Sequence, residues 1–262
     1  MTDELCLIRG GGDLATGVAW RLNRAGFPVV VTELAHPLTV RRTVALSTAV
    51  TEGSVDVEGM VGRLARRADE AVHVAFGGDV GVVVSEGLPD IGADVVIDAR
   101  LAKRNIDTST DDAKLVVALG PGFTAGVDCH AVIETMRGPR LGRCIWDGAA
   151  APNTESPGSV GGRAAERVLR APVDGATVWK VAIGDLVEDG QLLGHVAGTE
   201  LVAPFGGGVR GLIRDGTTVP RGLKIGDIDP RHDTDVNEIS DKALAVGGGA
   251  LEAVMTWSTR SR

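Results

Sequence analysis

Three ionisable residues in one short segment, Asp128, His130 and Glu134, are the best candidates for acid–base chemistry in this sequence. His130 and Glu134 are four residues apart, so on a helix they would share a face. A histidine beside an orienting carboxylate is a common general acid–base pair, and the same spacing could supply two metal ligands. No third His or Cys stands at ligand spacing, so we predict catalytic roles for these residues and no metal site. The alternative is an N-cap aspartate followed by an exposed helical pair.

Two glycine-rich loops could direct main-chain amides at an anionic ligand. The first, at residues 10–17, follows a short apolar strand and precedes an amphipathic helix. Glycine permits close backbone approach to a phosphate, and free N–H groups at a helix start favour negative charge. Gly10, Gly12 and Ala15 fit a relaxed dinucleotide fingerprint. Glu33 ends the next expected strand about 20 residues further on, where a ribose-hydroxyl acceptor is expected.

The second loop, at residues 120–126, repeats this arrangement, with a helix expected from near Asp128 to about residue 137. Two such loops on one sheet could hold the two ends of a polyphosphate or one anionic cofactor. Basic residues that follow neighbouring strands could add contacts to phosphate, although solvated side chains in ordinary polar loops are the alternative. The predicted binding residues are Gly10, Gly11, Gly12, Asp13, Ala15, Thr16, Gly17, Glu33, Arg41, Arg42, Lys103, Arg104, Asn105, Gly120, Gly122, Phe123, Thr124 and Gly126.

The elements that must position these residues indicate an α/β fold. Nearly continuous β-branched runs are typical of strands buried on both faces of a parallel sheet. We therefore expect a Rossmann-like parallel-sheet domain over residues 1–150, followed by a Pro-, Gly- and Ser-rich linker at 151–164. Within that domain we expect strands at 5–9, 28–34, 71–76, 81–85, 94–101 and 115–119, and a helix at 54–71.

The C-terminal half contains an internal repeat at an offset of 32 residues, in which AP-x-x-G precedes G-x-x-V-x-x-G-x-x-x-G. A short period seen only twice predicts two interlocked β units in one small barrel. This part resembles the biotinyl/lipoyl-like barrel-sandwich hybrid, whose carrier members attach their cofactor to a lysine between the halves. The corresponding residues 195–200 contain no lysine, so the resemblance implies a scaffold, docking surface or lid.

We expect this all-β domain at residues 165–232 and a C-terminal helical tail at 233–262. Gly247, Gly248 and Gly249 interrupt the pattern of the tail. They predict a helix–helix turn or, alternatively, a loop over a ligand.

Composition excludes several classes of protein. A net charge of −8 argues against a general nucleic-acid binder. No apolar run reaches the roughly 18 residues of a transmembrane helix, and the first residues lack the pattern of a signal peptide. Cys6, Cys129 and Cys144 form no CxxC pair, which is typical of a reducing compartment. We expect a cytoplasmic protein without nucleic-acid or membrane partners, and leave open whether it forms a homo-oligomer.

Long motifs spread over the chain resemble the YqeB-type accessory proteins, which are associated with selenium-dependent molybdenum hydroxylases. They include RGGGDLATGVAWRL, LAKRN, LGPGFTAGVDCHAVIETMRG and ISDKALAVGGGALEA. The resemblance implies a role in maturation or insertion of the molybdenum cofactor, with a hydroxylase subunit as partner. It also implies a Rossmann-like part similar to XdhC-type cofactor chaperones. Carried over by motif, the family's site covers residues 10–17, Arg41, Arg42, 103–105, 120–126, Asp128, His130 and Glu134, without Cys129 or Cys144.

We therefore expect an accessory protein that binds the molybdenum cofactor, or its nucleotide form, through both loops and presents it to a hydroxylase. Two alternatives stay open. One is an NAD(P)-dependent oxidoreductase with Glu33 on the ribose and His130 as acid–base. The other is a non-catalytic assembly module. The sequence does not decide whether the protein is an enzyme.

Overall fold

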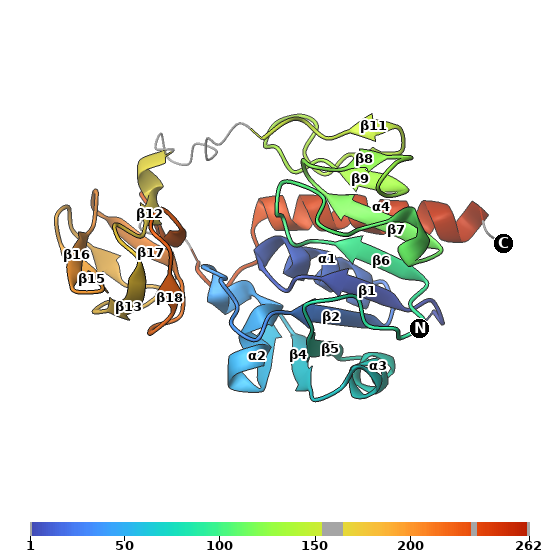
Figure 1. Cartoon of the computed structure of the whole chain (residues 1–262), viewed down its shortest axis with the longest axis horizontal. Coiled ribbons are helices and arrows are strands. Elements are labelled where there is room, and N and C mark those ends of the chain that lie inside the picture. Colours follow the sequence, from blue (N-terminus) through green and yellow to red (C-terminus); the bar gives the residue numbers. More distant parts are fainter. Residues whose placement is uncertain (1, 154–164, 232–234, 261–262) are drawn as a thin grey trace. The chain divides into compact units, whose positions relative to one another are not determined.

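The computed structural model describes residues 2–153, 165–231 and 235–260, which fall into two compact units (Figure 1). Unit 1 comprises Met1–Pro37, Ala45–Asn153 and Ile239–Arg262, and unit 2 comprises Leu38–Val44 and Thr154–Glu238. The chain therefore passes back and forth between the units, whereas the predicted domains follow one another in a line. Most of the predicted linker, residues 154–164, lies outside the described residues.

Unit 1 is built on one nine-stranded sheet whose seven inner strands are parallel and whose two edge strands are antiparallel to their neighbours. Apart from the strand at Met60–Ala65, which is half-buried, the inner strands are almost entirely buried, as their β-branched runs predict. In sheet order the strands are β10 (Cys144–Ile145), β9 (Ala131–Ile133), β7 (Leu115–Leu119), β6 (Val95–Asp98), β1 (Cys6–Arg9), β2 (Val29–Glu33), β5 (Val80–Val84), β4 (Met60–Ala65) and β3 (Ser54–Val57). A separate two-stranded pair joins β8 (Thr124–Ala125) to β11 (Gly148–Ala149).

Few helices connect these strands. α1 (Asp13–Arg24) joins β1 to β2, and α3 (Ala68–Phe76) joins β4 to β5. The connection from β6 to β7 has only the 3₁₀ turn η3 (Thr110–Asp112), and β7 leads to β9 through the second glycine loop. The other helical segments of unit 1 are η2 (Leu46–Thr48), α2 (Ala49–Glu52) and α4 (Asp241–Arg260).

The α/β class and the C-terminal helix agree with the sequence, but the predicted combination is wrong. A Rossmann-like parallel-sheet domain followed by a barrel-sandwich hybrid and a helical tail would have regular helical crossovers and domains in sequence order. Instead the sheet is mixed, helices are few, and α4 belongs to unit 1. Alternating apolar runs predict strands but do not specify how they are connected.

Two local predictions in this unit are also wrong. Residues 54–65 form the hairpin of β3 and β4 rather than a helix, because Glu58 and Gly59 both adopt positive φ in a tight turn. The predicted strand at 71–76 belongs to α3, which buries Ala71 and Ala75. A short apolar run fits either period, so these two alanines four residues apart decide the outcome.

Glycines let α1 and α4 pack closely. A Cβ on Gly17 would lie 2.4 Å from the carbonyl oxygen of Ala243, and one on Gly247 would lie 2.3 Å from that of Gly17. A Cβ on Gly249 would lie 2.0 Å from the carbonyl oxygen of Gly142. α4 is therefore one continuous helix beside α1, and Gly247, Gly248 and Gly249 form neither a turn nor a loop over a ligand (Figure 1).

Unit 2 consists of two four-stranded antiparallel sheets around a core that includes Leu193, Leu212 and Ile228. Strands that correspond across the repeat, such as β13 (Gly175–Trp179) and β17 (Gly207–Leu212), lie in opposite sheets, so the predicted interlocking of the two copies is confirmed. One sheet has the order β12 (Val168–Arg170), β19 (Lys224–Asp229), β17 (Gly207–Leu212), β14 (Leu186–Val187). The other has the order β16 (Thr199–Val202), β15 (Leu192–Val196), β13 (Gly175–Trp179), β18 (Thr218–Val219). Two 3₁₀ turns, η1 (Arg42–Val44) and η4 (Ala165–Arg167), complete the unit.

Candidate functional site

Three loops meet where β1, β6 and β7 end at the carboxyl edge of the unit 1 sheet. β1 lies between β2 and β6, so the strand order reverses there, and open α/β sheets bind ligands at such a switch point. The loop after β6, residues 99–109, is here called the β6 loop. Its backbone lies 3.2 Å from where a Cβ of Gly10 would stand and 2.5 Å from where one of Gly122 would stand. The β6 loop thus contacts both glycine loops, and the glycines permit those contacts.

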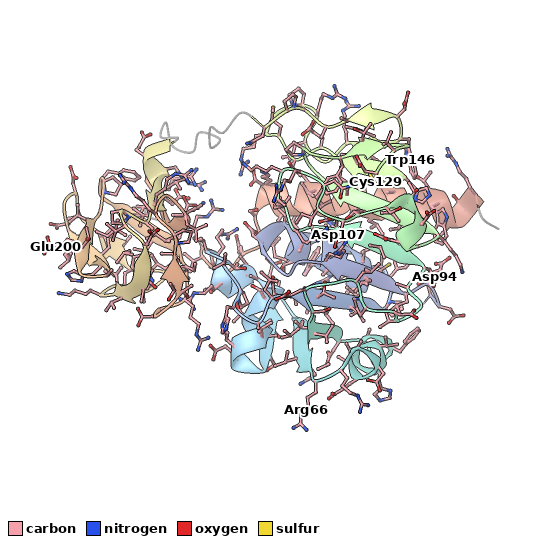
Figure 2. All side chains as sticks on the ribbon, in the orientation of Figure 1. Arg66, Asp94, Asp107, Cys129, Trp146 and Glu200 are labelled. Atoms are coloured by element: carbon pink, nitrogen blue, oxygen red, sulfur yellow. The ribbon has the colours of Figure 1, made fainter. Side chains whose placement is uncertain are left out.

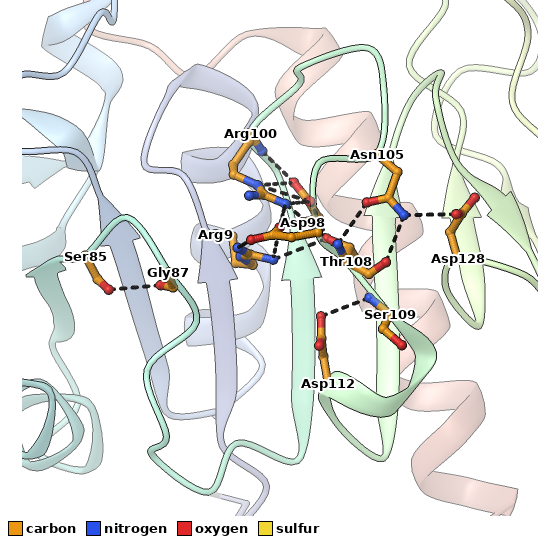
Figure 3. Close-up of polar contacts among 11 residues, drawn as sticks. Arg9, Ser85, Gly87, Asp98, Arg100, Asn105, Thr108, Ser109, Asp112 and Asp128 are labelled. Carbon is orange, nitrogen blue, oxygen red and sulfur yellow. Dashed lines mark hydrogen bonds and ion pairs between the residues drawn. The ribbon is translucent and has the colours of Figure 1, made fainter.

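Charged side chains from β1, β6 and the β6 loop form a connected cluster at this edge (Figure 3). Arg9 bonds Asp107 through both terminal nitrogens, with Nη1–Oδ1 and Nη2–Oδ2 distances of 2.9 Å. Arg100 Nη2 lies 2.7 Å from Asp107 Oδ1 and 2.5 Å from Asp98 Oδ2. The hydroxyl of Thr108 donates to Asp98 at 2.6 Å and accepts from Arg9 and Arg100. We call Arg9, Asp98, Arg100, Asp107 and Thr108 the edge cluster.

The members of the edge cluster differ in exposure. The side chains of Arg9 and Asp98 are each 2% exposed, whereas that of Asp107 is 48% exposed. Hydrogen bonds from Arg9, together with those from Arg100, lower the pKa of Asp107 to about 2 although partial burial opposes them. Partial burial also opposes the charge on Arg100, but its bonds to Asp98 and Asp107 outweigh it and raise its pKa. The lowered pKa of Asp107 and the raised pKa of Arg100 both favour the ion pair between these two side chains.

Asn105 and Asp128, both predicted site residues, lie together and hold the β6 loop against the second glycine loop (Figure 3). The amide of Asn105 donates to Asp128 Oδ1 at 2.9 Å and to the Thr108 carbonyl at 2.8 Å. Its carbonyl oxygen accepts from Thr108 N, and Asp128 Oδ2 accepts from Thr124 N at 2.7 Å. Both side chains therefore position backbone.

The predicted pair of His130 and Glu134 does not share a helix face. Residues 131–133 form β9, which buries three consecutive apolar residues beside β7. His130 Nδ1 accepts from Val116 N at 2.9 Å, and Glu134 is buried and accepts from Met136 N and Ala151 N, each at 2.8 Å. The apolar run prefers the buried sheet to a helix, which separates the two side chains. The predicted acid–base pair is thus not assembled.

The first glycine loop bonds to the protein's own groups. Gly11 N donates to Glu33 Oε2 at 2.8 Å, and Glu33 Oε1 accepts from Leu34 N at 2.7 Å. Gly10 N donates to the Thr32 carbonyl, and the Gly11 carbonyl accepts from Ser47 N. Glu33 thus caps the loop of its own chain, which gives no support to its role as a ribose acceptor. Gly12 precedes α1, and Asp13 starts it.

Several other predicted binding residues have packing roles. Ala15 is buried in α1, and the hydroxyl of Thr16 donates to the Gly12 carbonyl and accepts from Leu46 N. Gly17 contacts α4 as described above. Phe123 is part of the core that includes Ala71 and Ala75 of α3.

The backbone of the second glycine loop also has internal partners. Gly120 N donates to the Ile133 carbonyl, and Gly126 N donates to that of Cys129. Asn105 N donates to the Gly122 carbonyl at 3.0 Å, which joins this loop to the β6 loop. The close approach predicted for the glycines is therefore made to protein backbone.

The predicted basic residues divide between the two units. Lys103 and Arg104 are exposed on the β6 loop, and Lys103 Nζ donates to Asn153 Oδ1 at 2.8 Å. Arg41 and Arg42 belong to unit 2, where they donate to the carbonyls of Glu238 and Leu212 at 2.9 and 2.8 Å. These bonds hold residues 38–44 within unit 2.

Sequence reasoning missed Arg9, Arg100, Asp107 and Thr108. A usable signal existed for two of them, because Arg9 directly precedes the three glycines and Arg100 follows the last residue of β6 by two positions. Polar residues at the carboxyl ends of adjacent parallel strands meet at one edge. Asp107 and Thr108 carry no such signal, since only the path of the β6 loop brings them back.

The surroundings of the three thiols disfavour the reactive thiolate form. Cys6 and Cys129 are buried, and Cys129 follows the second glycine loop (Figure 2). Burial raises the pKa of Cys129 and of Cys144 to about 12 and raises that of Cys6 further. Because the thiolate is the nucleophile, these positions are unsuited to thiol or selenium transfer.

Within the described residues, no group of three or more His, Cys, Asp and Glu side chains has the arrangement of a metal site. No helix in the same part of the chain has the length and apolar character needed to cross a bilayer.

No family model matches this chain. An Escherichia coli (strain K12) protein named "Uncharacterized protein YqeB" is 48% identical to it over 256 residues, or 96% of the chain. The chain is a relative of YqeB. It spans about half of that protein, since the match covers 47% of YqeB. The likeness to YqeB expected from the motifs is thereby confirmed.

Two solved structures have low similarity to the chain. An aspartoacylase family protein from Mesorhizobium loti matches with a TM-score of 0.29 and 16% identity, over 88% of this chain and 86% of that one. A succinylglutamate desuccinylase/aspartoacylase from Rhodobacter sphaeroides matches with a TM-score of 0.25 and 17% identity, over 87% and 88%. Neither name is that of a Rossmann-like or carrier-domain protein, and at these TM-scores neither likeness carries an argument about this chain.

Proposed function

We propose that this chain is an accessory protein that binds a phosphorylated cofactor at the carboxyl edge of the unit 1 sheet. The observation that supports this is the meeting of the loops after β1, β6 and β7 at the point where the strand order reverses. The ligand class is proposed from the side chains at this edge. Arg9, Arg100, Lys103 and Arg104 supply guanidinium and ammonium groups there, and such groups suit phosphate.

The pathway in this proposal is maturation of selenium-dependent molybdenum hydroxylases, with the molybdenum cofactor or its nucleotide form as the ligand and a hydroxylase subunit as the recipient. It rests on the motifs shared with YqeB-type proteins and on the likeness to YqeB along the chain. Molybdopterin carries a phosphate, which the arginine and lysine side chains at this edge would bind. We assign this role to the cytoplasm.

A second candidate is a non-catalytic assembly module that binds no cofactor. It is favoured by one observation, the bonding of Glu33 to Gly11 N, because this main-chain amide would otherwise face a phosphate. On this alternative the glycine loops serve only to pack the three loops together.

Calorimetric titration of the whole chain with molybdopterin, CTP, NADH and NADPH tests the first proposal against the second. We expect molybdopterin or CTP to bind and the two nicotinamide nucleotides not to bind. Specific binding would also raise the melting temperature by mass action. Absence of binding by all four, with a hydroxylase subunit still retained in a pull-down, would favour the assembly module.

A matched pair of glycine variants tests the location of the site. Gly122 and Gly126 both adopt positive φ, but only a Cβ on Gly122 would strike the β6 loop, whereas Gly126 faces open space. Both Gly122→Ala and Gly126→Ala strain the backbone, so both variants should lose stability. A further loss of affinity in Gly122→Ala alone would therefore come from displacement of the β6 loop. We expect binding to weaken at least about tenfold in Gly122→Ala and much less in Gly126→Ala. If folded Gly122→Ala and Gly126→Ala proteins bind the ligand with equal affinity, the proposed location is wrong.

A further inference from the structure

We propose that Asp107 occupies, within the free protein, the place of the ligand's phosphate, and that Arg9 and Arg100 are the phosphate-binding residues it covers. This inference rests on the proposed function, because it names the anionic group bound at the same edge. It adds a mechanism, the exchange of an internal carboxylate for a phosphate oxygen pair.

The geometry around Asp107 is that of a bound oxyanion. Arg9 presents Nη1 and Nη2 to the two carboxylate oxygens at 2.9 Å each, and Arg100 Nη2 lies 2.7 Å from Oδ1. Three guanidinium nitrogens thus converge on two oxygens. Such a fork suits a phosphate or pyrophosphate as well as a carboxylate.

Exposure distinguishes the removable partner from the fixed ones. The side chain of Arg9 is 2% exposed, that of Arg100 is 19% exposed, and that of Asp98 is 2% exposed. The side chain of Asp107 is 48% exposed, so Asp107 is the carboxylate of the edge cluster that solvent reaches most readily. Asp98 and Thr108 remain to orient Arg100 and Arg9 when Asp107 leaves.

The backbone on both sides of Asp107 is tied down. Asn105 bonds to Asp128 and to Thr108, and Thr108 bonds to Asp98. Leu101 and Lys103 adopt positive φ, so the β6 loop is fixed in a conformation that L residues seldom adopt. Rotation of the Asp107 side chain alone can therefore uncover the arginines without unfolding the loop. Without Asp107, Arg100 keeps its ion pair with Asp98, but the buried Arg9 keeps only the Thr108 hydroxyl. Because a buried guanidinium without a carboxylate partner is costly, Asp107 leaves only when another anion replaces it.

Titration of Asp107→Asn with inorganic pyrophosphate, at low ionic strength by calorimetry, tests this exchange. In the wild type, only molecules in which Asp107 has left the arginines can bind pyrophosphate. The apparent affinity is therefore the intrinsic affinity multiplied by the fraction of such molecules. We expect Asp107→Asn to bind pyrophosphate at least about tenfold more tightly than wild type, and the double variant with Arg100→Gln to lose that gain. Asp79→Asn is the matched control, because Asp79 pairs with Arg63 on the hairpin of β3 and β4 and should leave affinity unchanged.

Circular dichroism of each variant establishes whether it is folded, and its melting temperature gives a second readout. Should Asp107→Asn be partly unfolded, pyrophosphate should raise its melting temperature more than that of Asp79→Asn. A folded Asp107→Asn with wild-type pyrophosphate affinity, or an unfolded one that pyrophosphate does not rescue, overturns the exchange. Binding of molybdopterin or CTP by wild type would leave the proposed function standing in that case. Tighter pyrophosphate binding with no cofactor binding would support the arginine site and overturn the proposed function.

Discussion

Carboxylates near the candidate site bond mainly to nearby backbone or to neighbouring side chains. Glu33, Glu134 and Asp128 each accept hydrogen bonds from main-chain N–H groups, and Asp128 also accepts one from Asn105. Buried polar groups must be paired, so such residues are commonly used in this way. Residue type and spacing therefore indicated where polar groups gather, but not which of them bind to the chain itself.

The ion pairs of Asp107 predict how the stability of the protein changes at low pH. Its pKa is lowered to about 2 in the folded protein, against about 3.9 in an unfolded chain. A depressed pKa contributes stability above the unfolded value and loses it as pH falls through the folded value. Wild type should therefore be more stable than Asp107→Asn at pH 4 and above, and this difference should shrink toward pH 2. Urea unfolding of both proteins at several pH values checks it, and a difference that stays constant would refute the assigned ion pair.

At the scale of elements, the strands that carry the site were predictable and the segments that close it were not. β1, β2, β6 and β7 are long enough runs of buried apolar residues to be recognised from the sequence. The sequence predicts a helix over residues 131–133 because Asp128 resembles an N-cap, yet these residues form β9 and Asp128 accepts a hydrogen bond from Thr124 N. The path of the β6 loop depends on contacts with Gly10 and Gly122, which no local pattern records.

α4 allows a sharp test of close helix packing. A Cβ on Gly249 would lie 2.0 Å from the Gly142 carbonyl oxygen, whereas a Cβ on Gly248 would have no atom within 4 Å. Gly249→Ala should therefore lower the free energy of unfolding by roughly 1–3 kcal/mol through overpacking. Gly248→Ala should raise it by about 0.5–1 kcal/mol, since alanine favours a helix more than glycine does. Chemical denaturation of the two single variants measures both changes, and equal effects would contradict this packing.

At the scale of the whole molecule, the two units are interleaved along the chain. Residues 38–44 separate α1 and β2 from the rest of unit 1, yet they bond to Glu238 and Leu212 within unit 2. The prediction of consecutive domains is wrong here because the composition of residues 38–44 does not show to which unit they belong.

A pair of variants in β17 tests this assignment. A Cβ on Gly211 would lie 2.8 Å from the Val40 carbonyl oxygen, but one on Gly208 meets no atom closer than 3.6 Å. We expect Gly211→Ala to destabilise unit 2 by roughly 1–3 kcal/mol and Gly208→Ala to have little effect. Hydrogen exchange would report the first change as lost protection of β17 and β19 amides. Unchanged protection in Gly211→Ala would mean that residues 38–44 do not pack there.

The position of α4 has a consequence for how this chain matures during synthesis. The strands of unit 1 emerge early from the ribosome, but the helix that packs against α1 is encoded by residues 241–260. Unit 2, whose segments end at Glu238, can close first. A nascent chain that ends just before α4 would contain a folded unit 2, but in unit 1 the apolar surface that α4 normally covers would be exposed. Chaperones and proteases recognise such exposed apolar surface.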